Sequence, residues 1–135
     1  MSLAWEPIAG RYATLTLHGQ ACRVYFEEAG NGIPLLCLHT AGADTSQYRH
    51  LMTDSAVTDH FRVIAFDMPW HGKSFPPAGY QDTEYRLTTD GYTETILAVA
   101  DALELERPVL MGCSMGGRIV LNIAAHHADR FCALI

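Results

Sequence analysis

The sequence predicts an α/β fold, with a mostly parallel sheet, an N-terminal antiparallel hairpin and helices on both faces. Along most of the chain, short apolar runs that suit buried strands alternate with longer segments whose apolar residues recur at helical spacing. This alternation is typical of parallel sheets, and right-handed crossovers between the strands place helices on both faces. Ahead of it, two segments with a period of two residues flank a short turn, as in an antiparallel hairpin.

Each expected strand rests on a local pattern. Residues 13–17 and 22–26 alternate apolar and polar side chains around the turn His18-Gly19-Gln20, which predicts the hairpin. Continuous apolar runs predict the remaining strands, which are expected to be buried. Together the expected strands cover residues 13–17, 22–26, 33–38, 62–66, 108–111 and 131–135.

Three helices are expected between these strands. Asp44 or Thr45 can cap the first and Thr89 or Asp90 the second, because their side-chain oxygens accept the free N–H groups of a first helical turn. The polar stretch 75–88 is expected to be irregular. The expected helices cover residues 44–55, 89–103 and 115–127.

Length and composition indicate one globular domain. The chain has 135 residues, of which 49% are hydrophobic and 18% charged, a balance that can form a single core. The net charge of −6 argues against nucleic acid or an anionic membrane surface as a partner. We see neither an apolar run long enough to span a membrane nor a secretory signal.

The four cysteines indicate in which cellular compartment the protein is expected. Each lies in or beside an apolar, strand-like run, and no two form a C-x-x-C pair. We therefore expect buried free thiols in a cytoplasmic protein, rather than disulfides or a metal site. No His, Asp and Glu spacing resembles a ligand set, so no metal is expected.

The motif with most chemical content is Gly112-Cys113-Ser114-Met115-Gly116, which matches the nucleophile-elbow pattern G-x-S-x-G. A strand is expected before it and a helix directly after it. A serine in such a sharp turn has a strained backbone and an exposed hydroxyl, and only very small residues fit two positions before and after it. Glycine occupies both positions around Ser114, whereas methionine occupies both around Cys113. The pattern therefore selects the serine over the neighbouring thiol.

Three segments together resemble the N-terminal half of an α/β-hydrolase fold protein. The sequence LCLHTAG at residues 36–42 is similar to the family's strand that ends in a His-Gly loop. The sequence FDMPWHGKS at 66–74 is similar to its D-x-P-G-x-G-x-S loop, and MGCSMGG at 111–117 is similar to its elbow. Their order and the intervening helices also fit, so the resemblance extends over nearly the whole chain.

The resemblance implies specific roles in a site that uses no cofactor. Ser114 would be the nucleophile, and the backbone N–H groups of Met115 and Ala41 would form the oxyanion hole. His39 and Thr40 are candidates for lining the site, and for His39, which ends a strand, we favour the alternative that it hydrogen-bonds the loop that carries Ala41. Thr40 is one departure from the family pattern, which usually has glycine there. Trp70 is the other, because the second loop also usually has glycine.

The sequence does not supply a complete catalytic triad. In this family the acid and then the histidine follow the serine, on loops after later strands. His126 and His127 are expected at the far end of the helix after Ser114, and Asp67 is expected to tie down its own loop. We therefore expect these 135 residues to be one piece of a longer protein. A second polypeptide segment, as partner, would complete the domain with a lid, the acid and the histidine.

Three functions remain open at this point. The first is a serine-nucleophile hydrolase of a small, largely apolar carbonyl substrate, an ester, lactone, thioester or carbon–carbon bond, with small-molecule catabolic hydrolases as the nearest type. Cofactor-free perhydrolases share the same motifs. The second is a catalytically dead binding or scaffold protein on the same fold. The third, a nucleotide-binding domain, is disfavoured because the turn lacks both G-x-G-x-x-G and G-K-[ST].

Overall fold

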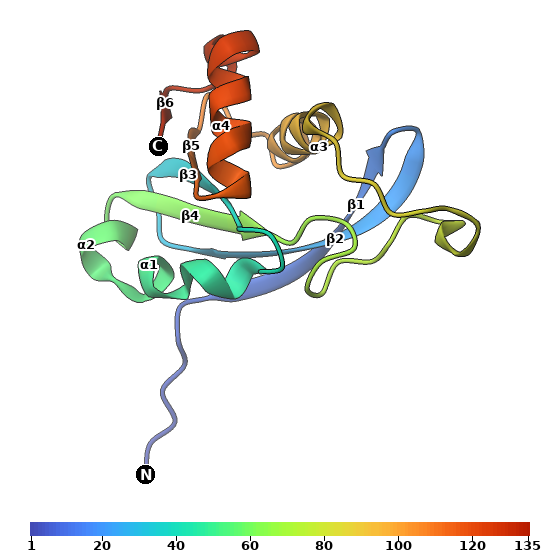
Figure 1. Ribbon diagram of the computed structural model, residues 1–135. Coiled ribbons are helices and arrows are strands. Elements are labelled where there is room, and N and C mark those ends of the chain that lie inside the picture. Colours follow the sequence, from blue (N-terminus) through green and yellow to red (C-terminus); the bar gives the residue numbers. More distant parts are fainter.

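The computed structural model describes all residues 1–135, and its six strands form one sheet in the order β1-β2-β4-β3-β5-β6 (Figure 1). The strands are β1 (Ala9–Leu17), β2 (Gln20–Ala29), β3 (Ile33–Leu38), β4 (Phe61–Phe66), β5 (Val109–Gly112) and β6 (Ala133–Leu134). The α-helices are α1 (Arg49–Thr53), α2 (Ser55–Thr58), α3 (Thr89–Ala102) and α4 (Met115–His126). Short 3-10 helices are η1 (Thr45–Tyr48), η2 (Tyr80–Asp82) and η3 (Ala128–Arg130). The predicted α/β class is confirmed.

The strand pairing places the loops that matter for function at one edge of the sheet. β2 pairs antiparallel with both β1 and β4, whereas the pairs β4–β3, β3–β5 and β5–β6 are parallel. The predicted hairpin is confirmed and is longer than expected, since its pairing runs from Leu17 with Gln20 to Ala9 with Glu28. Because β4, β3 and β5 are parallel, their carboxyl ends and the following loops meet at the same edge.

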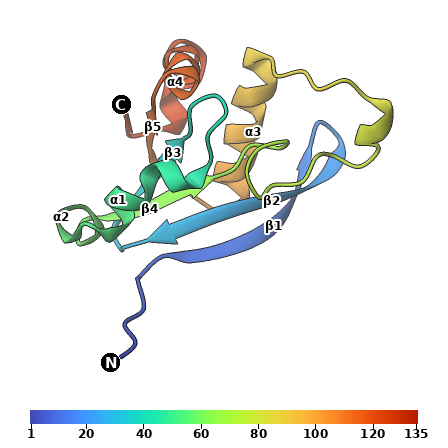
Figure 2. The same ribbon diagram turned by 60° about the horizontal axis from the view of Figure 1, so that its bottom comes forward.

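Helices cover both faces of the sheet, as predicted. α3 and α4 lie side by side over one face (Figures 1 and 2). There they pack on alternate residues of the strands, those whose side chains point to that face. The 3-10 helix η1 and α1 cover the other face through Tyr48 and Met52, which pack on Leu35, Cys37 and Val63. None of the helices combines the length and apolar character that crossing a membrane requires.

The first predicted helix, 44–55, is wrong as a single element. Its residues and the next three form three short pieces, η1, α1 and α2. Asp54 interrupts them with an extended backbone (φ −94°, ψ 114°), and its carboxylate accepts the N–H of Ala56 at 2.9 Å. Aspartate competes in this way with helical hydrogen bonds, so it ends α1 and caps α2. Asp44 is the N-cap of η1, as predicted.

The other boundaries shift by small amounts. α3 is capped by Thr88, whose hydroxyl oxygen accepts the N–H of Gly91 at 3.0 Å, rather than by Thr89 or Asp90. The stretch 75–88 is irregular apart from η2. β6 is shorter than the predicted strand over 131–135.

All four cysteines are free, but only two are buried. Burial raises the pKa of the Cys37 thiol to about 12, and Cys22 is also inside the core. Cys113 and Cys132 are exposed, so the expectation of four buried thiols is wrong for these two. Cys113 lies in the sharp turn after β5, and Cys132 precedes the short edge strand β6, where the sheet has no further neighbour.

Candidate active site

Ser114 occupies the predicted sharp turn between β5 and α4. Its backbone has φ 54° and ψ −116°, outside the helical and extended regions, and α4 begins at the next residue. A non-glycine residue with positive φ is strained by about 1–3 kcal/mol, and it persists only where the surrounding structure holds it in place. The Ser114 side chain is exposed and makes no capping hydrogen bond to α4.

Two glycines explain how this turn fits beneath the serine. A Cβ on Gly112 would lie 2.5 Å from the carbonyl carbon of Gly116, and a Cβ on Gly116 would lie 2.8 Å from the carbonyl oxygen of Leu38. The start of α4 therefore packs against the backbone of both β5 and β3 without room for a side chain. The spacing of two residues on either side of Ser114 has the steric cause that the sequence predicts.

The loop after β3 lies beside this turn. Leu38 at the end of β3 is in register with Gly112 at the end of β5, so residues 39–43 leave the sheet next to Ser114. The N–H of Ala43 donates to the Thr40 carbonyl at 3.1 Å, and Gly42 has φ 70°. These are the features of a type II turn, in which the third residue needs positive φ.

His39 orients the peptide that joins Thr40 to Ala41. Its Nε2 accepts the N–H of Met68 at 3.1 Å, which leaves the proton on Nδ1, and Nδ1 donates to the Thr40 carbonyl at 2.8 Å. Burial lowers the pKa of His39, which favours the neutral ring that a hydrogen bond accepted at Nε2 requires. In a trans peptide the carbonyl and the N–H point in opposite directions. Anchoring the Thr40 carbonyl therefore fixes the direction of the Ala41 N–H.

Gln47 holds the peptide that joins His39 to Thr40, and the sequence analysis did not identify this residue. Its side-chain Oε1, in η1 just after the loop, accepts the N–H of Thr40 at 2.9 Å. Thr40 therefore departs from the family's usual glycine without loosening the turn, because both of its backbone polar groups are bonded. A glutamine seven residues after the loop carries no motif that would reveal this contact.

Three polar groups at this edge have no partner in the chain. The Ser114 hydroxyl makes no hydrogen bond, and the N–H groups of Ala41 and Met115 donate none. A nucleophilic hydroxyl and two unengaged backbone donors are the parts that an acyl-transfer site needs. The sheet register brings together the loops that carry all three.

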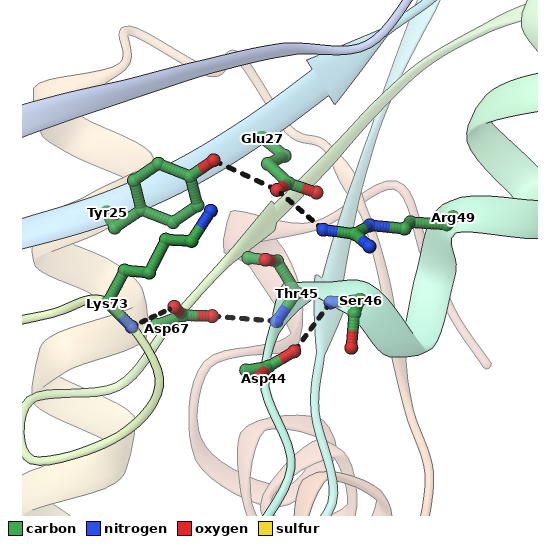
Figure 3. A network of polar contacts seen from close by, with 8 residues as sticks. All are labelled: Tyr25, Glu27, Asp44, Thr45, Ser46, Arg49, Asp67 and Lys73. Atoms are coloured by element: carbon green, nitrogen blue, oxygen red, sulfur yellow. Dashed lines mark hydrogen bonds and ion pairs between the residues drawn. The ribbon is translucent and has the colours of Figure 1, made fainter.

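The loop after β4 contrasts with this pattern, because its carboxylate is fully engaged (Figure 3). Asp67 is 1% exposed, and its two carboxylate oxygens accept the N–H groups of Thr45 and Lys73, both at 2.7 Å. Its backbone carbonyl accepts the Ser74 hydroxyl at 2.6 Å, and the Ser74 oxygen in turn accepts the N–H of Tyr25 at 2.9 Å. Asp67 thus ties its own loop to β2 and η1, as the sequence predicts.

A second set of polar contacts, around Glu27, lies close to the hydrogen bonds of Asp67 in Figure 3. Tyr25 donates its hydroxyl to Glu27 at 2.9 Å, and burial, reinforced by this hydrogen bond, raises the pKa of Tyr25 to about 12. Arg49 of α1 pairs with the same carboxylate oxygen at 3.5 Å. The other oxygen of Glu27 is buried without a partner. These contacts join β2 to α1 beneath the loop of residues 67–74.

Trp70 stands where the resemblance leads one to expect glycine, and the structure gives the local reason. The N–H of His71 donates to the Met68 carbonyl at 2.9 Å, which closes a turn with Pro69 second and Trp70 third. Trp70 has φ 72° in that third position, which normally favours glycine. Its indole packs against Tyr80 and Tyr85, with ring centroids 5.6 and 5.5 Å away.

No histidine of the chain forms a hydrogen bond with Ser114. Both ring nitrogens of His39 are engaged, and His126, at the last turn of α4, contacts the Asn122 carbonyl through Nδ1 at 2.9 Å. His71 contacts the Pro69 carbonyl at 3.1 Å. No three His, Cys, Asp or Glu side chains converge as a metal site would require.

Comparison with known proteins agrees with this geometry. Residues 33–135 match the family described as alpha/beta hydrolase fold. A protein of Mycobacterium phage D29, provisionally named a non-heme haloperoxidase, is 36% identical over 115 residues, which are 84% of this chain and 38% of that protein. The 2-hydroxymuconate semialdehyde hydrolase of Pseudomonas sp. strain CF600 is 34% identical over 116 residues, again 84% of this chain and 38% of the relative.

A solved structure shows the same relationship in three dimensions. The enol-lactonase from Burkholderia xenovorans LB400 superposes with a TM-score of 0.75 and 28% identity, over 92% of this chain and 45% of that one. The chain therefore spans less than half the length of each of these three proteins.

Proposed function

Because the chain belongs to the alpha/beta hydrolase fold family, we propose that Ser114 is the nucleophile of a hydrolase that acts on small, largely apolar carbonyl compounds. The observation that carries the proposal is the strained, exposed Ser114 beside two unengaged backbone donors. A serine in a positive-φ turn costs stability, and its hydroxyl contributes no hydrogen bond to the fold.

The proposed reaction proceeds through an acyl-enzyme. The Ser114 oxygen forms a bond to the carbonyl carbon while its proton passes to a base, and the carbonyl oxygen takes the negative charge. The N–H groups of Ala41 and Met115 hold that oxyanion, each donor being worth about 100-fold or more in rate. The bond to the leaving group then breaks as that group takes the proton. Water adds to the acyl carbon, releases the acid and restores Ser114.

We propose that the base and its orienting acid come from a second polypeptide segment that completes the domain. His39 and Asp67, the buried histidine and carboxylate at this edge, are both fully engaged in holding loops. In the family, the acid and the histidine follow the serine along the chain. We also propose a cytoplasmic location, which the four free cysteines support because thiols stay reduced in that compartment.

More than one type of reaction is compatible with this site. The names of two relatives, a semialdehyde hydrolase and an enol-lactonase, favour carbon–carbon or lactone cleavage of a small molecule. The haloperoxidase name favours the perhydrolase alternative, in which peroxide rather than water attacks the acyl-enzyme. Both share the steps at Ser114.

Labelling of the full-length protein with a fluorophosphonate probe tests the proposal. We expect one label per chain at Ser114, lost in Ser114→Ala and retained in Cys113→Ala, which removes the exposed thiol next to it. Absence of labelling in a folded, complete sample would contradict the proposal and support a scaffold protein on the same fold. A label on another residue would also contradict it.

A further inference from the structure

Three successive peptides lead from the end of β3 to the Ala41 N–H, and a side chain holds each of them. His39 holds the last, between Thr40 and Ala41. The two before it are held by neighbouring residues of η1, Tyr48 and Gln47. The direction of the donor assigned to the oxyanion hole therefore depends on η1 as well as on His39.

Tyr48 holds the first of these peptides, which joins Leu38 to His39. Its hydroxyl donates to the Leu38 carbonyl at 2.6 Å, and the residue is only 6% exposed. Burial raises the pKa of Tyr48, so the hydroxyl keeps the proton that it donates. A Cβ on Gly116 would lie 2.8 Å from the same carbonyl oxygen. Tyr48 thus holds the point at which the loop after β3 meets the turn of Ser114.

Gln47 holds the second peptide, which joins His39 to Thr40. Its side-chain oxygen accepts the N–H of Thr40 at 2.9 Å. This bond makes the Thr40 N–H unavailable to a substrate, whereas the Ala41 N–H is free. Gln47 therefore both orients the loop and leaves Ala41 as the donor that faces the site.

The helix η1 is itself fixed at its start. Asp44 caps it by accepting the N–H of Ser46 at 2.8 Å (Figure 3), and Thr45 is buried. Catalytic groups reach their full effect only when supporting residues hold them within about 0.5 Å of the productive position. Two side chains on a capped element that contact successive peptides are suited to that task.

We propose that Gln47 and Tyr48 are positioning residues of the oxyanion hole, which hold the loop so that the Ala41 N–H points at the oxygen of the reacting carbonyl. The inference rests on the proposed function and extends it to how the site keeps its shape. Both residues act through the loop backbone rather than on the substrate. A donor that is fixed in advance stabilises the developing charge without reorganisation during the reaction.

Fluorophosphonate labelling of variants of the full-length protein tests the proposal without knowledge of the substrate. Gln47→Met keeps the side-chain length and removes the acceptor, and Tyr48→Phe keeps the ring and removes the donor. The phosphoryl oxygen of the probe occupies the oxyanion hole during attack by Ser114. We expect each variant to lower the second-order rate of labelling about tenfold, which is part of what a complete oxyanion donor contributes.

A pair of ketones separates positioning from a merely structural role. With pentyl trifluoromethyl ketone, the Ser114 oxygen bonds to the carbonyl carbon, its proton passes to the base, and the carbonyl oxygen becomes an oxyanion. Pentyl methyl ketone has the same chain but binds as the neutral ketone. Their Ki values follow from protection against labelling. In both variants the Ki of the trifluoromethyl ketone should rise about tenfold, and that of the methyl ketone by less than about twofold.

Two matched controls make the same changes elsewhere in the chain. Gln81→Met alters an exposed glutamine of η2, another 3-10 helix, and Tyr12→Phe alters an exposed tyrosine of β1. We expect both controls to keep the wild-type rate of labelling and both Ki values.

The outcomes separate this inference from the proposed function. If the wild-type protein is not labelled at Ser114, the proposed function fails and the inference fails with it. If the wild-type protein is labelled but either variant is labelled at the same rate, only the positioning role is wrong. Slower labelling with an unchanged Ki of the trifluoromethyl ketone would also overturn the inference, because the loss would not arise in the oxyanion hole.

Discussion

The loops after β4 and β5 leave the same edge of the sheet but differ in how their polar groups are used. In the β4 loop, Asp67 accepts hydrogen bonds at both carboxylate oxygens and at its carbonyl. In the β5 turn, the Ser114 hydroxyl and the Met115 N–H have no partner. The first loop braces the fold, and the second presents reactive groups to whatever binds there.

Backbone strain alone does not separate the two loops. Trp70 and Ser114 both have positive φ, 72° and 54° respectively. Trp70 adopts this conformation inside a closed turn, with its indole packed on two tyrosines. Ser114 adopts it with its side chain exposed. Strain therefore indicates chemistry only where it is combined with unpartnered polar groups.

The largest expected effect comes from disturbing the β5 turn. In Gly116→Ala, the new Cβ would lie 2.8 Å from the Leu38 carbonyl oxygen, so α4 and β3 must separate. We expect a loss of about 2–4 kcal/mol in the free energy of unfolding. Displacing Ser114 should also slow its labelling about 100-fold or more. Urea unfolding and the second-order labelling rate measure the two effects.

Gly79→Ala is the control for this substitution. Gly79 has φ 80° but open space around it, so only backbone strain is added, worth about 1 kcal/mol. Labelling should be unaffected. If Gly116→Ala proved as mild as Gly79→Ala, the close packing beneath the serine would not be what holds the turn.

The next effect concerns the Asp67 carboxylate, which holds the β4 loop in place. Asp67→Asn replaces one acceptor oxygen by an NH₂ donor, which then faces the N–H of Thr45 or Lys73. We expect unfolding to become easier by about 2–3 kcal/mol, while the folded fraction still labels at Ser114. Asp59→Asn, at an exposed position, should change stability by less than about 0.5 kcal/mol. Loss of labelling with stability intact would instead make Asp67 part of the catalytic machinery.

The smallest effect concerns His39, which joins the β4 loop to the loop after β3, because it accepts the N–H of Met68 and donates to the Thr40 carbonyl. Burial lowers its pKa below the ordinary value of about 6.5, so the unfolded chain binds the proton more readily than the folded one. Stability should therefore decline as the pH falls below about 6.5, until the lower folded-state pKa is reached. His39→Gln should flatten this part of the profile of unfolding free energy against pH.

His126→Gln is the matched control, since His126 is an exposed histidine at the end of α4. Its pH profile should follow that of the wild-type protein. A wild-type profile that is as flat as that of His39→Gln would mean that His39 does not need to be neutral to hold the Thr40 peptide.

The β5 turn could be predicted from sequence because its cause is local. Two glycines at fixed distance from Ser114, a strand before and a helix after are all visible along the chain. The role of Asp67 in its own loop was also predictable, because the motif carries Lys73 and Ser74, two of its three partners, whereas the contact with Thr45 in η1 was not. The break at Asp54 was missed, since an aspartate's choice between helix interior and cap depends on the packing around it.

The remaining site features depend on contacts between distant segments. Gln47 reaches Thr40 from a 3-10 helix, and His39 accepts the N–H of Met68 from the loop after β4. Neither pair has a spacing that a motif could encode. The exposure of Cys113 was missed for a related reason, because the turn that frees Ser114 also carries its neighbour out of the core.

Trapping the acyl-enzyme of the full-length protein tests the central claim most directly. The protein would be mixed with a slowly hydrolysed ester, quenched in acid and digested with trypsin. We predict that the peptide ending at Arg118 carries the mass of the acyl group on Ser114, and that Ser114→Ala carries none. An acyl group on Cys113, or turnover of the ester with no modified Ser114 at any time point, would contradict the role assigned to this serine.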